Sequence, residues 1–335
     1  MPARLGRPAL ETVDSPLVST IVKSSPPAAA RGESAPPSRP EIDRVIDAAL
    51  AEDLGPGGLE GLAGDATTAA LVPPEERARA VLIAKTRGVL CGLDVFLRVF
   101  ERLDPACRVV QRAREDGTGF EAGERLVVLE GRARALLSGE RTALNLIQRL
   151  SGIATLTARY VERAGAAARV LDTRKTTPGL RALERYAVRC GGGENHRFGL
   201  YDQAMIKDNH VDLARAHRPA RSLADLVQGI RARHGDELRL TVEARDADEA
   251  LQAVQGGADC VLLDNLDAAT LGALCPRLRA AARARGRQVE LEASGGIDLE
   301  NVAAIARSGV DRVSIGALTH SAPALDLSLQ LEGLA

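Results

Sequence analysis

The stretch QVELEASGGID, residues 288–298, decides how the second half of this chain folds. It is a short apolar run that ends in a serine and two glycines before a helical pattern resumes. Six such runs alternate with helical segments from residue 169 to residue 316: RVLD, AMIK, LRLTVE, DCVLLD, QVELEA and RVSIG. This alternation is typical of a parallel α/β sheet. Six repeats favour a barrel over an open sheet.

Chemically distinctive residues follow each run at the point where the strand is expected to end. They are Arg174 and Lys175, then Lys207, Glu243, Asp264, Ser294 to Gly296, and Gly316 with Ala317. The carboxyl ends of the strands of a (β/α) barrel converge on its active site. The pattern therefore predicts one site that combines lysines, an arginine, two carboxylates and two glycine-containing turns.

Lysine is scarce in this chain, because only four of the 44 basic residues are lysine: Lys23, Lys85, Lys175 and Lys207. Codon bias that spared two surface lysines is one interpretation of the pair at strand ends. The alternative is that these positions require a compact ammonium, which a guanidinium cannot replace. An inward-facing cation needs partners, which Asp208 and Glu243 would supply in part and an anionic substrate would complete.

The turns at Ser294–Gly296 and at Gly316–Ala317 predict phosphate binding. Backbone N–H groups where a helix begins attract anions, and we expect a helix from Asp298 onward. Glu243 and Asp264 have two interpretations. They form a Mg²⁺ pair beside substrate phosphates, or they are ion-pair partners of the two lysines. The five histidines show no zinc-binding pattern.

The bulk composition excludes several classes of protein. Aromatic residues are 2% of the 335 residues and the net charge is −1, which argues against nucleic-acid stacking and against a basic membrane-binding surface. The chain contains neither a long apolar run nor the apolar stretch of a signal peptide. Its five cysteines form no CxxC pair, so we expect reduced thiols in a cytoplasmic protein.

The first part of the chain predicts a separate small domain. Residues 1–40 are rich in Pro, Ala and Ser and are predicted to be a disordered extension, with a helix from RPEIDRVIDAALAEDL onward. Residues 59–73 are predicted to form a glycine-rich loop. Residues 79–131 mix β-like runs with one helix, LDVFLRVFERL, and a long helix is expected over roughly 133–164.

The stretch LDTRKTTPGLRALERYAVRCGGGENHRFGLYDQAMIKDNH, residues 171–210, closely resembles the central signature of the quinolinate phosphoribosyltransferase family. The resemblance covers roughly residues 41–335. It extends to AEDLG, GDATTAAL, ERTALNLIQRLSGIATLT, LLDN, LEASGGIDLENV and SIGALTHSAPALDLSL. It implies an N-terminal α/β-sandwich domain, residues 41–138, beside an incomplete, TIM-like (β/α) barrel, residues 139–319. Residues 320–335 would then pack back on the sandwich.

The resemblance also implies a reaction and a set of site residues. The family transfers a phosphoribosyl group from phosphoribosyl pyrophosphate (PRPP) to quinolinate and releases CO₂, in NAD biosynthesis, using Mg²⁺ and no organic cofactor. Its catalytic positions fall on Lys175, Lys207, Glu243 and Asp264, with the last two holding the metal. Its remaining substrate-binding positions fall on Arg141, Arg174, His196, Arg197, Ser294, Gly295, Gly296, Gly316 and Ala317. The family is homodimeric, and Arg141 corresponds to an arginine donated by the neighbouring subunit.

The chain departs from the family pattern at three places: the 1–40 extension, extra residues near 56–63, and TVEARD, where Arg245 replaces the second acid of a stretch close to VEVEN.

Alternative functions are the molybdenum-transport-associated paralogue, a phosphoribosyltransferase for another acceptor, and a non-catalytic anion sensor. A Schiff-base aldolase is a further alternative, against which the many cations argue. Borohydride trapping with a carbonyl substrate would detect the aldolase.

Overall fold

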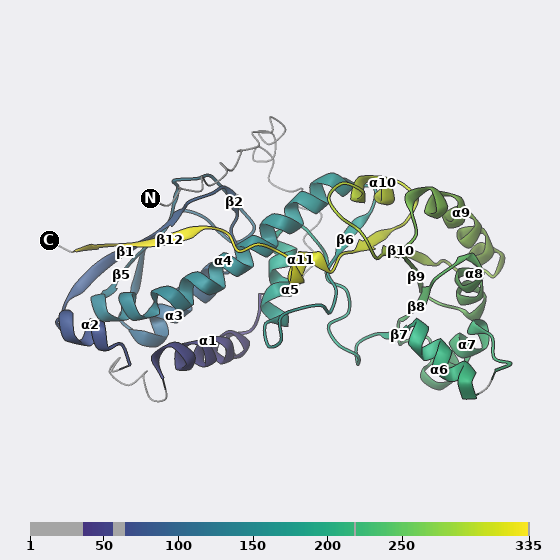
Figure 1. The fold of residues 1–335 in the computed structure, drawn as a ribbon, viewed down its shortest axis with the longest axis horizontal. Helices are drawn as coiled ribbons and strands as arrows, with labels where there is room; N and C mark the ends of the chain where they lie inside the picture. The colour runs from purple at the N-terminus through teal and green to yellow at the C-terminus, as the bar shows by residue number, and fades with distance from the viewer. Residues whose placement is uncertain (1–35, 56–63, 218, 334–335) are drawn as a thin grey trace, which may run out of the picture.

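The computed structural model describes residues 36–55, 64–217 and 219–333, which form two lobes joined by one long helix (Figure 1). The first lobe contains a four-stranded antiparallel sheet, and the second contains a six-stranded parallel sheet. Helix α4 (Ala133–Ala164) runs from the first lobe into the second, so both lobes pack on the same helix. The domain boundary expected at residues 138/139 falls inside this helix.

The first lobe is an α/β layer structure. Its sheet has the order β12-β1-β5-β3, with β1 (Arg77–Ala84), β3 (Arg108–Arg112), β5 (Arg125–Arg132) and β12 (Leu327–Gly333). A second, two-stranded antiparallel sheet pairs β2 (Gly88–Val89) with β4 (Gly119–Phe120). The helices are α1 (Arg39–Leu54), α2 (Ala66–Leu71) and α3 (Leu93–Leu103). Helix α3 has the bounds that its sequence pattern predicts.

Helix α1 begins at Arg39, where the sequence pattern also places its start. Ser38 and Glu41 form a capping box at its N-terminus, and every fourth residue from Ile42 is buried. Arg39 and Pro40, which the predicted extension includes, are therefore helical. The extension up to residue 35 and the extra residues 56–63 lie outside the described residues.

The expectation of a loop over residues 59–73 is wrong for Ala66–Leu71, which form α2. The cause is local, because the Asp65 carboxylate accepts hydrogen bonds from the Thr68 N–H and from the Ser138 hydroxyl, both at 2.9 Å. This cap stabilises one short helix and ties it to α4.

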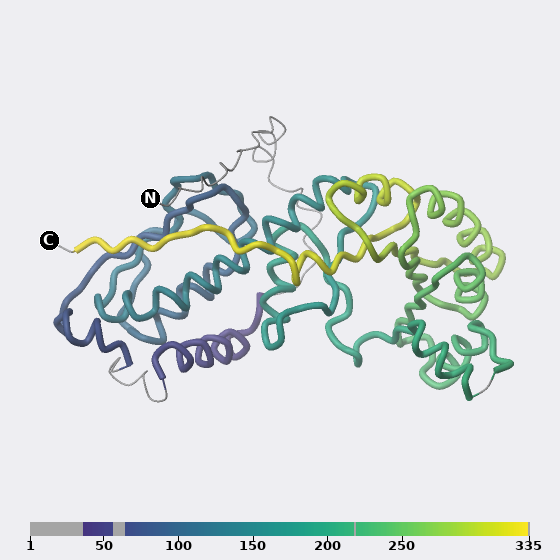
Figure 2. Tube along the Cα trace, viewed as in Figure 1, coloured from purple at the N-terminus to yellow at the C-terminus, as the bar shows by residue number. Residues whose placement is uncertain are grey.

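The C-terminal strand β12 returns to the first lobe. It pairs antiparallel with β1 from Ala78 opposite Gly333 to Ala84 opposite Leu327, and Figure 2 shows the end of the chain lying along that sheet. On its way the chain crosses α4 at Gly152, where an added Cβ would overlap the carbonyl oxygen of Pro323. Gly152 therefore allows the two segments to pack closely.

Gly152→Ala is expected to lower the free energy of unfolding by about 2–3 kcal/mol, because the added methyl forces apart α4 and the returning segment. Gly229→Ala is the matched control, since Gly229 lies in helix α7 (Leu223–His234) with no atom within 4 Å of an added Cβ. That control should stabilise the protein by up to about 1 kcal/mol. Denaturant titration of both variants measures the difference, and equal effects would contradict the packing argument.

The second lobe is the incomplete barrel. Its strand order is β6-β11-β10-β9-β8-β7, with strands β6 (Arg169–Leu171), β7 (Ala204–Ile206), β8 (Leu240–Ala244), β9 (Cys260–Asp264), β10 (Glu290–Ser294) and β11 (Arg312–Ser314). Within the described residues no ladder joins β6 to β7, so the barrel is open between them. The fold class predicted from the sequence is confirmed.

Helices cover the outside of this sheet (Figure 1). They are α6 (Asp208–His217), α7 (Leu223–His234), α8 (Ala247–Gly256), α9 (Ala268–Ala284) and α10 (Val302–Ala306). Helices α5 (Arg181–Cys190) and α11 (Ala317–His320) lie beside α4 where the lobes meet. Buried Leu, Val and Ala side chains dominate the core of both lobes. None of the helices in the described part of the chain has the length and apolar character needed to cross a bilayer.

Candidate active site

The strand register brings four predicted site residues to one face of the parallel sheet. Ser294 lies opposite Asp264 in the β9–β10 ladder, and Glu243 lies opposite Leu262, two residues before Asp264. Because side chains alternate along a strand, Glu243, Asp264 and Ser294 point to the same face, and so does Lys207 after β7. Neighbouring strand ends thus place one cation and two carboxylates together.

Lys207 and the two carboxylates form the acidic side of the site. The Lys207 Nζ donates a hydrogen bond to Glu243 Oε2 at 2.7 Å, and the Glu243 side chain is only 11% exposed. Burial raises the pKa of Asp264, and the nearby Glu243 carboxylate raises it further. Two carboxylates that repel each other, with one lysine between them, are an arrangement that a divalent cation would stabilise.

Two guanidinium groups form the basic side of the site. Arg197 is buried, and it donates to the Gln203 carbonyl oxygen at 2.9 Å. Burial lowers the pKa of Arg197, and the adjacent Arg174 lowers it further. The Nε of Arg174 is buried without a hydrogen-bond partner among the described residues. Two like charges held together with an unsatisfied donor favour an anionic ligand.

Lys175 links the ends of two neighbouring strands, β6 and β11. An added Cβ on Gly316 would lie 2.9 Å from the Lys175 Cδ, so the lysine side chain lies over this glycine. The Thr319 hydroxyl donates to the Lys175 carbonyl oxygen at 2.8 Å. The ends of β6 and β11 are therefore in contact, and the Lys175 side chain is anchored beside the turn that begins α11.

A buried scaffold that the sequence analysis missed positions the basic residues. The Asp172 carboxylate accepts from the His196 N–H at 2.7 Å and from the Asn195 side chain at 2.6 Å. Arg185 donates to the carbonyl oxygens of His196 and Arg197, both at 2.9 Å. These residues lie inside the motif LDTRKTTPGLRALERYAVRCGGGENHR, but their helix and loop positions gave no separate signal.

His196 lies deeper than the other predicted substrate-binding residues. Its Nε2 is 3.2 Å from Glu292 Oε2, and both side chains are buried, at 6% and 0% exposure. The backbone N–H of Arg197 donates to His196 Nδ1 at 2.7 Å. Glu292 also accepts from Arg312 Nε at 2.7 Å. The imidazole thus contacts the barrel interior below the strand ends.

The turn after β10 allows an anionic ligand to approach its backbone closely. Gly295 and Gly296 have φ values of +86° and +60°, and neither amide donates a hydrogen bond within the described part of the chain. Such consecutive free amides bind anions. The expected helix start at Asp298 is wrong, because α10 begins at Val302. Asp298 instead accepts from the N–H groups of Glu300 and Asn301 in a local turn.

Gly295→Ala is expected to lower kcat/KM for a phosphate-bearing substrate by about 100-fold, because an added Cβ would overlap the Asn265 side chain beside Asp264. Gly123→Ala is the matched control. Gly123 has nearly the same φ, +84°, but no atom lies within 4 Å of its added Cβ. Steady-state kinetics of both variants separate the collision from backbone strain, and an equally active Gly295→Ala enzyme would contradict the role of this turn.

Arg141 and Arg245 lie away from this group. Arg141 is exposed on α4 and lines a separate hollow of about 340 Å³ together with Asp53, Asp65 and Leu137. Arg245 pairs with Glu249 at 2.7 Å and with Asp212 at 3.7 Å, so its charge is directed toward α6 and α8. Within one chain, Arg141 is not part of the cationic group.

Asp264→Asn is expected to stabilise the fold at pH 7 while lowering kcat more than about 100-fold. The pKa of Asp264 is raised in the folded protein, so an ionised Asp264 lowers the free energy of unfolding at any pH above that pKa. The stability that Asp264→Asn gains over the wild type should therefore vanish as the pH falls through the raised pKa of Asp264. Denaturant titrations at pH 7 and pH 4 measure this, with Asp248→Asn on the surface of α8 as control. A variant less stable at pH 7 would contradict the electrostatic argument.

The chain matches two protein-family descriptions. "Quinolinate phosphoribosyl transferase, N-terminal domain" matches residues 65–151, and "Quinolinate phosphoribosyl transferase, C-terminal domain" matches residues 153–330. The nicotinate-nucleotide pyrophosphorylase (carboxylating) of Mycobacterium leprae is 40% identical over 290 residues, which cover 86% of this chain and 96% of that protein. The quinolinate phosphoribosyltransferase (decarboxylating) 1b of Nicotiana tabacum is 35% identical over 308 residues, covering 89% and 85%.

A solved structure agrees with these sequence matches. The nicotinate-nucleotide pyrophosphorylase from Francisella tularensis superposes with a TM-score of 0.76 at 36% identity, covering 90% of this chain and 100% of that chain. Sequence, fold and the arrangement of strand ends all lead to the same group of proteins. The chain belongs to the quinolinate phosphoribosyl transferase family.

Proposed function

We propose that this chain is a pentosyltransferase that transfers the phosphoribosyl group of PRPP to quinolinate with loss of CO₂. The products are nicotinate mononucleotide, CO₂ and pyrophosphate, a step of NAD biosynthesis. Relatives at 35–40% identity over most of the chain carry names for this activity. The observation that carries the proposal is the meeting of guanidinium, ammonium and carboxylate groups at one set of strand ends.

The basic side of the site fits a pyridine dicarboxylate. Quinolinate has two adjacent ring carboxylates, Arg174 and Arg197 lie near each other, and the Arg174 Nε is a buried donor without a hydrogen-bond partner among the described residues. Guanidinium groups bind carboxylates through paired hydrogen bonds. Lys175, which follows Arg174 in the segment after β6, adds a third charge. His196, held against Glu292, would position this basic side from below.

The acidic side of the site fits the phosphoribosyl donor. The adjacent carboxylates of Glu243 and Asp264 would hold Mg²⁺, which needs only one or two protein carboxylates when phosphates complete its shell. When bound, the ion neutralises negative charge on the departing pyrophosphate. The free amides of Gly295 and Gly296, with Ser294, would bind the ribose phosphate or pyrophosphate, and Gly316 with Ala317 would form the second phosphate contact.

The reaction depends more on how the protein positions the two substrates than on covalent catalysis by protein groups. The ring nitrogen of quinolinate forms a bond to C1 of the ribose as the C1–oxygen bond to pyrophosphate breaks. Lys207 and Lys175 would stabilise the anionic groups around this exchange. The nitrogen then carries a positive charge, and the adjacent carboxylate leaves as CO₂. The electron pair of the broken carbon–carbon bond remains on the ring carbon, which then takes up a proton.

A complete site requires a second chain in this proposal. Arg141 is exposed and lies apart from the other cations, so it would reach the site of a neighbouring subunit in a homodimer. The lobes would then correspond to an N-terminal sandwich domain with the returning C-terminal strand, and a catalytic barrel domain. The enzyme would act in the cytoplasm with small-molecule substrates only.

Product analysis tests the proposal. Purified protein is incubated with quinolinate, PRPP and Mg²⁺, and nicotinate mononucleotide is quantified, with nicotinate as a parallel acceptor. We expect product from quinolinate alone. Product from neither acceptor, while PRPP still binds, would refute the proposed acceptor and point to the paralogous enzyme type.

A further inference from the structure

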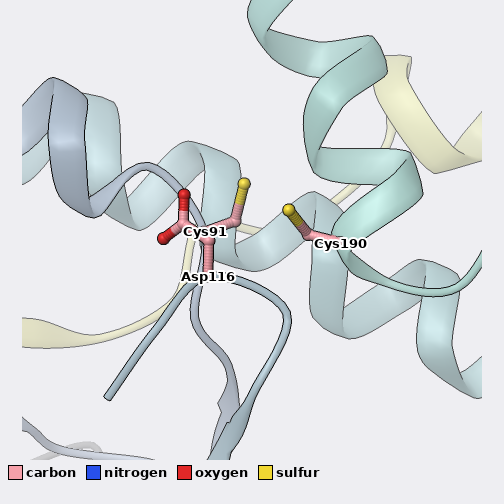
Figure 3. Close-up of side chains that lie close together, drawn as sticks. All are labelled: Cys91, Asp116 and Cys190. Atoms are coloured by element: carbon pink, nitrogen blue, oxygen red, sulfur yellow. The ribbon is translucent and has the colours of Figure 1, made fainter. Parts of the chain in front are cut away.

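A second cluster of reactive side chains lies where the two lobes meet. Cys91 follows β2, Asp116 lies in the loop between β3 and β4, and Cys190 is the last residue of α5. One ligand atom from each residue lies within 4.8 Å of the other two. Figure 3 shows the two sulfur atoms pointing toward one another, with the carboxylate beside Cys91. The catalytic residues described above are not part of this cluster.

A fourth polar group completes the cluster. Tyr186 lies one helical turn before Cys190 on α5, and its side chain adjoins Asp116 and Cys190. Two sulfurs and a carboxylate therefore come together from three separate segments of the chain, with a phenol beside them. Thiolate, carboxylate and a fourth oxygen are ligands that zinc accepts in tetrahedral sites.

The surrounding structure holds these ligands in place. Asp116 accepts hydrogen bonds from the N–H groups of Gly92 and Leu93 at 2.9 and 3.0 Å, which fixes its carboxylate at the start of α3. The Cys91 N–H donates to the Ser151 hydroxyl of α4 at 3.1 Å. Such outer contacts orient metal ligands and strengthen binding.

The loop between β3 and β4 approaches α5 closely enough for both segments to contribute ligands to one site. Gly117 has a φ of +82°, and an added Cβ there would lie 3.5 Å from the Cys190 carbonyl oxygen. The loop after β3 therefore packs directly on the end of α5. Cys190 and Asp116 are only partly buried, whereas Cys91 is fully buried, so an ion can enter from the side of Cys190.

The charges of the cluster favour a cation at its centre. A divalent ion, two thiolates and one carboxylate carry a net charge of about −1, which the neighbouring Arg189 balances.

We propose that Cys91, Cys190 and Asp116 bind a thiophilic divalent cation of the zinc class at the junction of the two lobes. Two thiol protons pass to solvent as the two metal–sulfur bonds form, so no oxidant or reductant takes part. Sulfur ligands of a tetrahedral zinc ion lie about 3.8 Å apart, given Zn–S bonds of about 2.3 Å, so the cluster needs to contract only slightly. The Tyr186 oxygen or a water fills the fourth position.

A Cys91–Cys190 disulfide is the rival outcome. A disulfide joins only two sulfur atoms and requires an oxidant, whereas the cluster also brings a carboxylate oxygen within 4.8 Å of both sulfurs. The geometry therefore favours metal over oxidation.

Bound metal would cross-link the lobes next to the catalytic site. Helix α5 carries Cys190 at its end and Arg185 in its middle, and Arg185 holds the backbone of His196 and Arg197. The ion would thereby fix the helix that supports the basic side of the site. This role is structural and does not depend on which acceptor the enzyme uses.

Cobalt titration of the full-length, reduced, metal-free protein tests the proposal. Co²⁺ is the probe, because cobalt–thiolate bonds give a charge-transfer absorption that oxygen ligands do not. We expect this absorption to saturate at one ion per chain and to disappear on addition of Zn²⁺. Cys190→Ser and Cys91→Ser should each lose most of it, and Asp116→Asn should weaken binding about tenfold or more.

Cys107→Ser is the matched control, since Cys107 is a partly buried free thiol outside the cluster. It should leave the cobalt spectrum unchanged, and circular dichroism confirms that each variant is folded. Absence of the charge-transfer band in the folded wild-type protein would overturn the proposal. So would a band that survives in Cys190→Ser, or peroxide conversion of the pair to a disulfide in protein that never binds cobalt.

Discussion

Lys207→Ala is expected to lower kcat by about 1,000-fold, the largest effect of any single substitution in the site. In the structure the Lys207 ammonium contacts Glu243 at 2.7 Å and offsets the mutual repulsion of Glu243 and Asp264. Without it, the acidic side carries two uncompensated carboxylates, and a polyanionic substrate is repelled. Steady-state kinetics with quinolinate and PRPP measure the loss.

Lys207→Arg separates charge from shape. If the position requires a compact ammonium, arginine should restore little of the lost turnover although the charge is kept. Lys85→Ala, which removes an exposed lysine from the loop after β1, serves as control and should be fully active. Near-normal turnover in Lys207→Arg would refute the steric argument while leaving the electrostatic role intact.

Mixing Arg141→Ala chains with Lys175→Ala chains is expected to restore activity that neither variant has alone. If Arg141 completes the neighbouring subunit's site, each mixed dimer has one site with both residues and one site with neither. Random mixing should then recover about a quarter of wild-type activity. Because Lys175 lies over Gly316 of its own chain, we expect it to serve that chain's site, so that the two substitutions complement each other.

The mixed dimers must be verified before the result is interpreted. Two different affinity tags allow the heterodimer to be purified and its activity measured directly. A confirmed heterodimer as inactive as the parent variants would show that Arg141 does not act across the interface. Arg141→Ala with normal activity would lead to the same conclusion by a shorter route.

The sequence predicts the positions of the site residues because strand ends carry a simple signal. An apolar run that stops at Lys207, Glu243 or Asp264 places a charged group where parallel strands share an edge, and the structure brings these groups together. Helices α3 and α4 are equally predictable, since their apolar residues follow a 3.6-residue period over many turns.

Features that depend on contacts between distant residues could not be predicted in this way. The Asp65 carboxylate that caps α2 also accepts a hydrogen bond from Ser138 of α4, 73 residues later. The burial of His196 depends on Glu292, almost 100 residues later. None of these contacts leaves a period or a motif in the sequence.

The cysteine cluster could not be predicted from the sequence either. The spacing of Cys91 and Cys190 resembles no metal-binding pattern, because the ligands come from two lobes that fold onto α4. Likewise, the scaffold of Asp172 and Arg185 is visible only once α5 is packed against β6. Tertiary structure, rather than local sequence, creates both arrangements.

Release of labelled CO₂ is the measurement that tests the central claim most directly. Quinolinate labelled in the carboxylate next to the ring nitrogen is incubated with the enzyme and Mg²⁺, with and without PRPP. If one site transfers the phosphoribosyl group and then uses the resulting pyridinium for decarboxylation, labelled CO₂ should equal nicotinate mononucleotide and require PRPP. Labelled CO₂ released without PRPP, or mononucleotide formed with the label retained, would contradict this account.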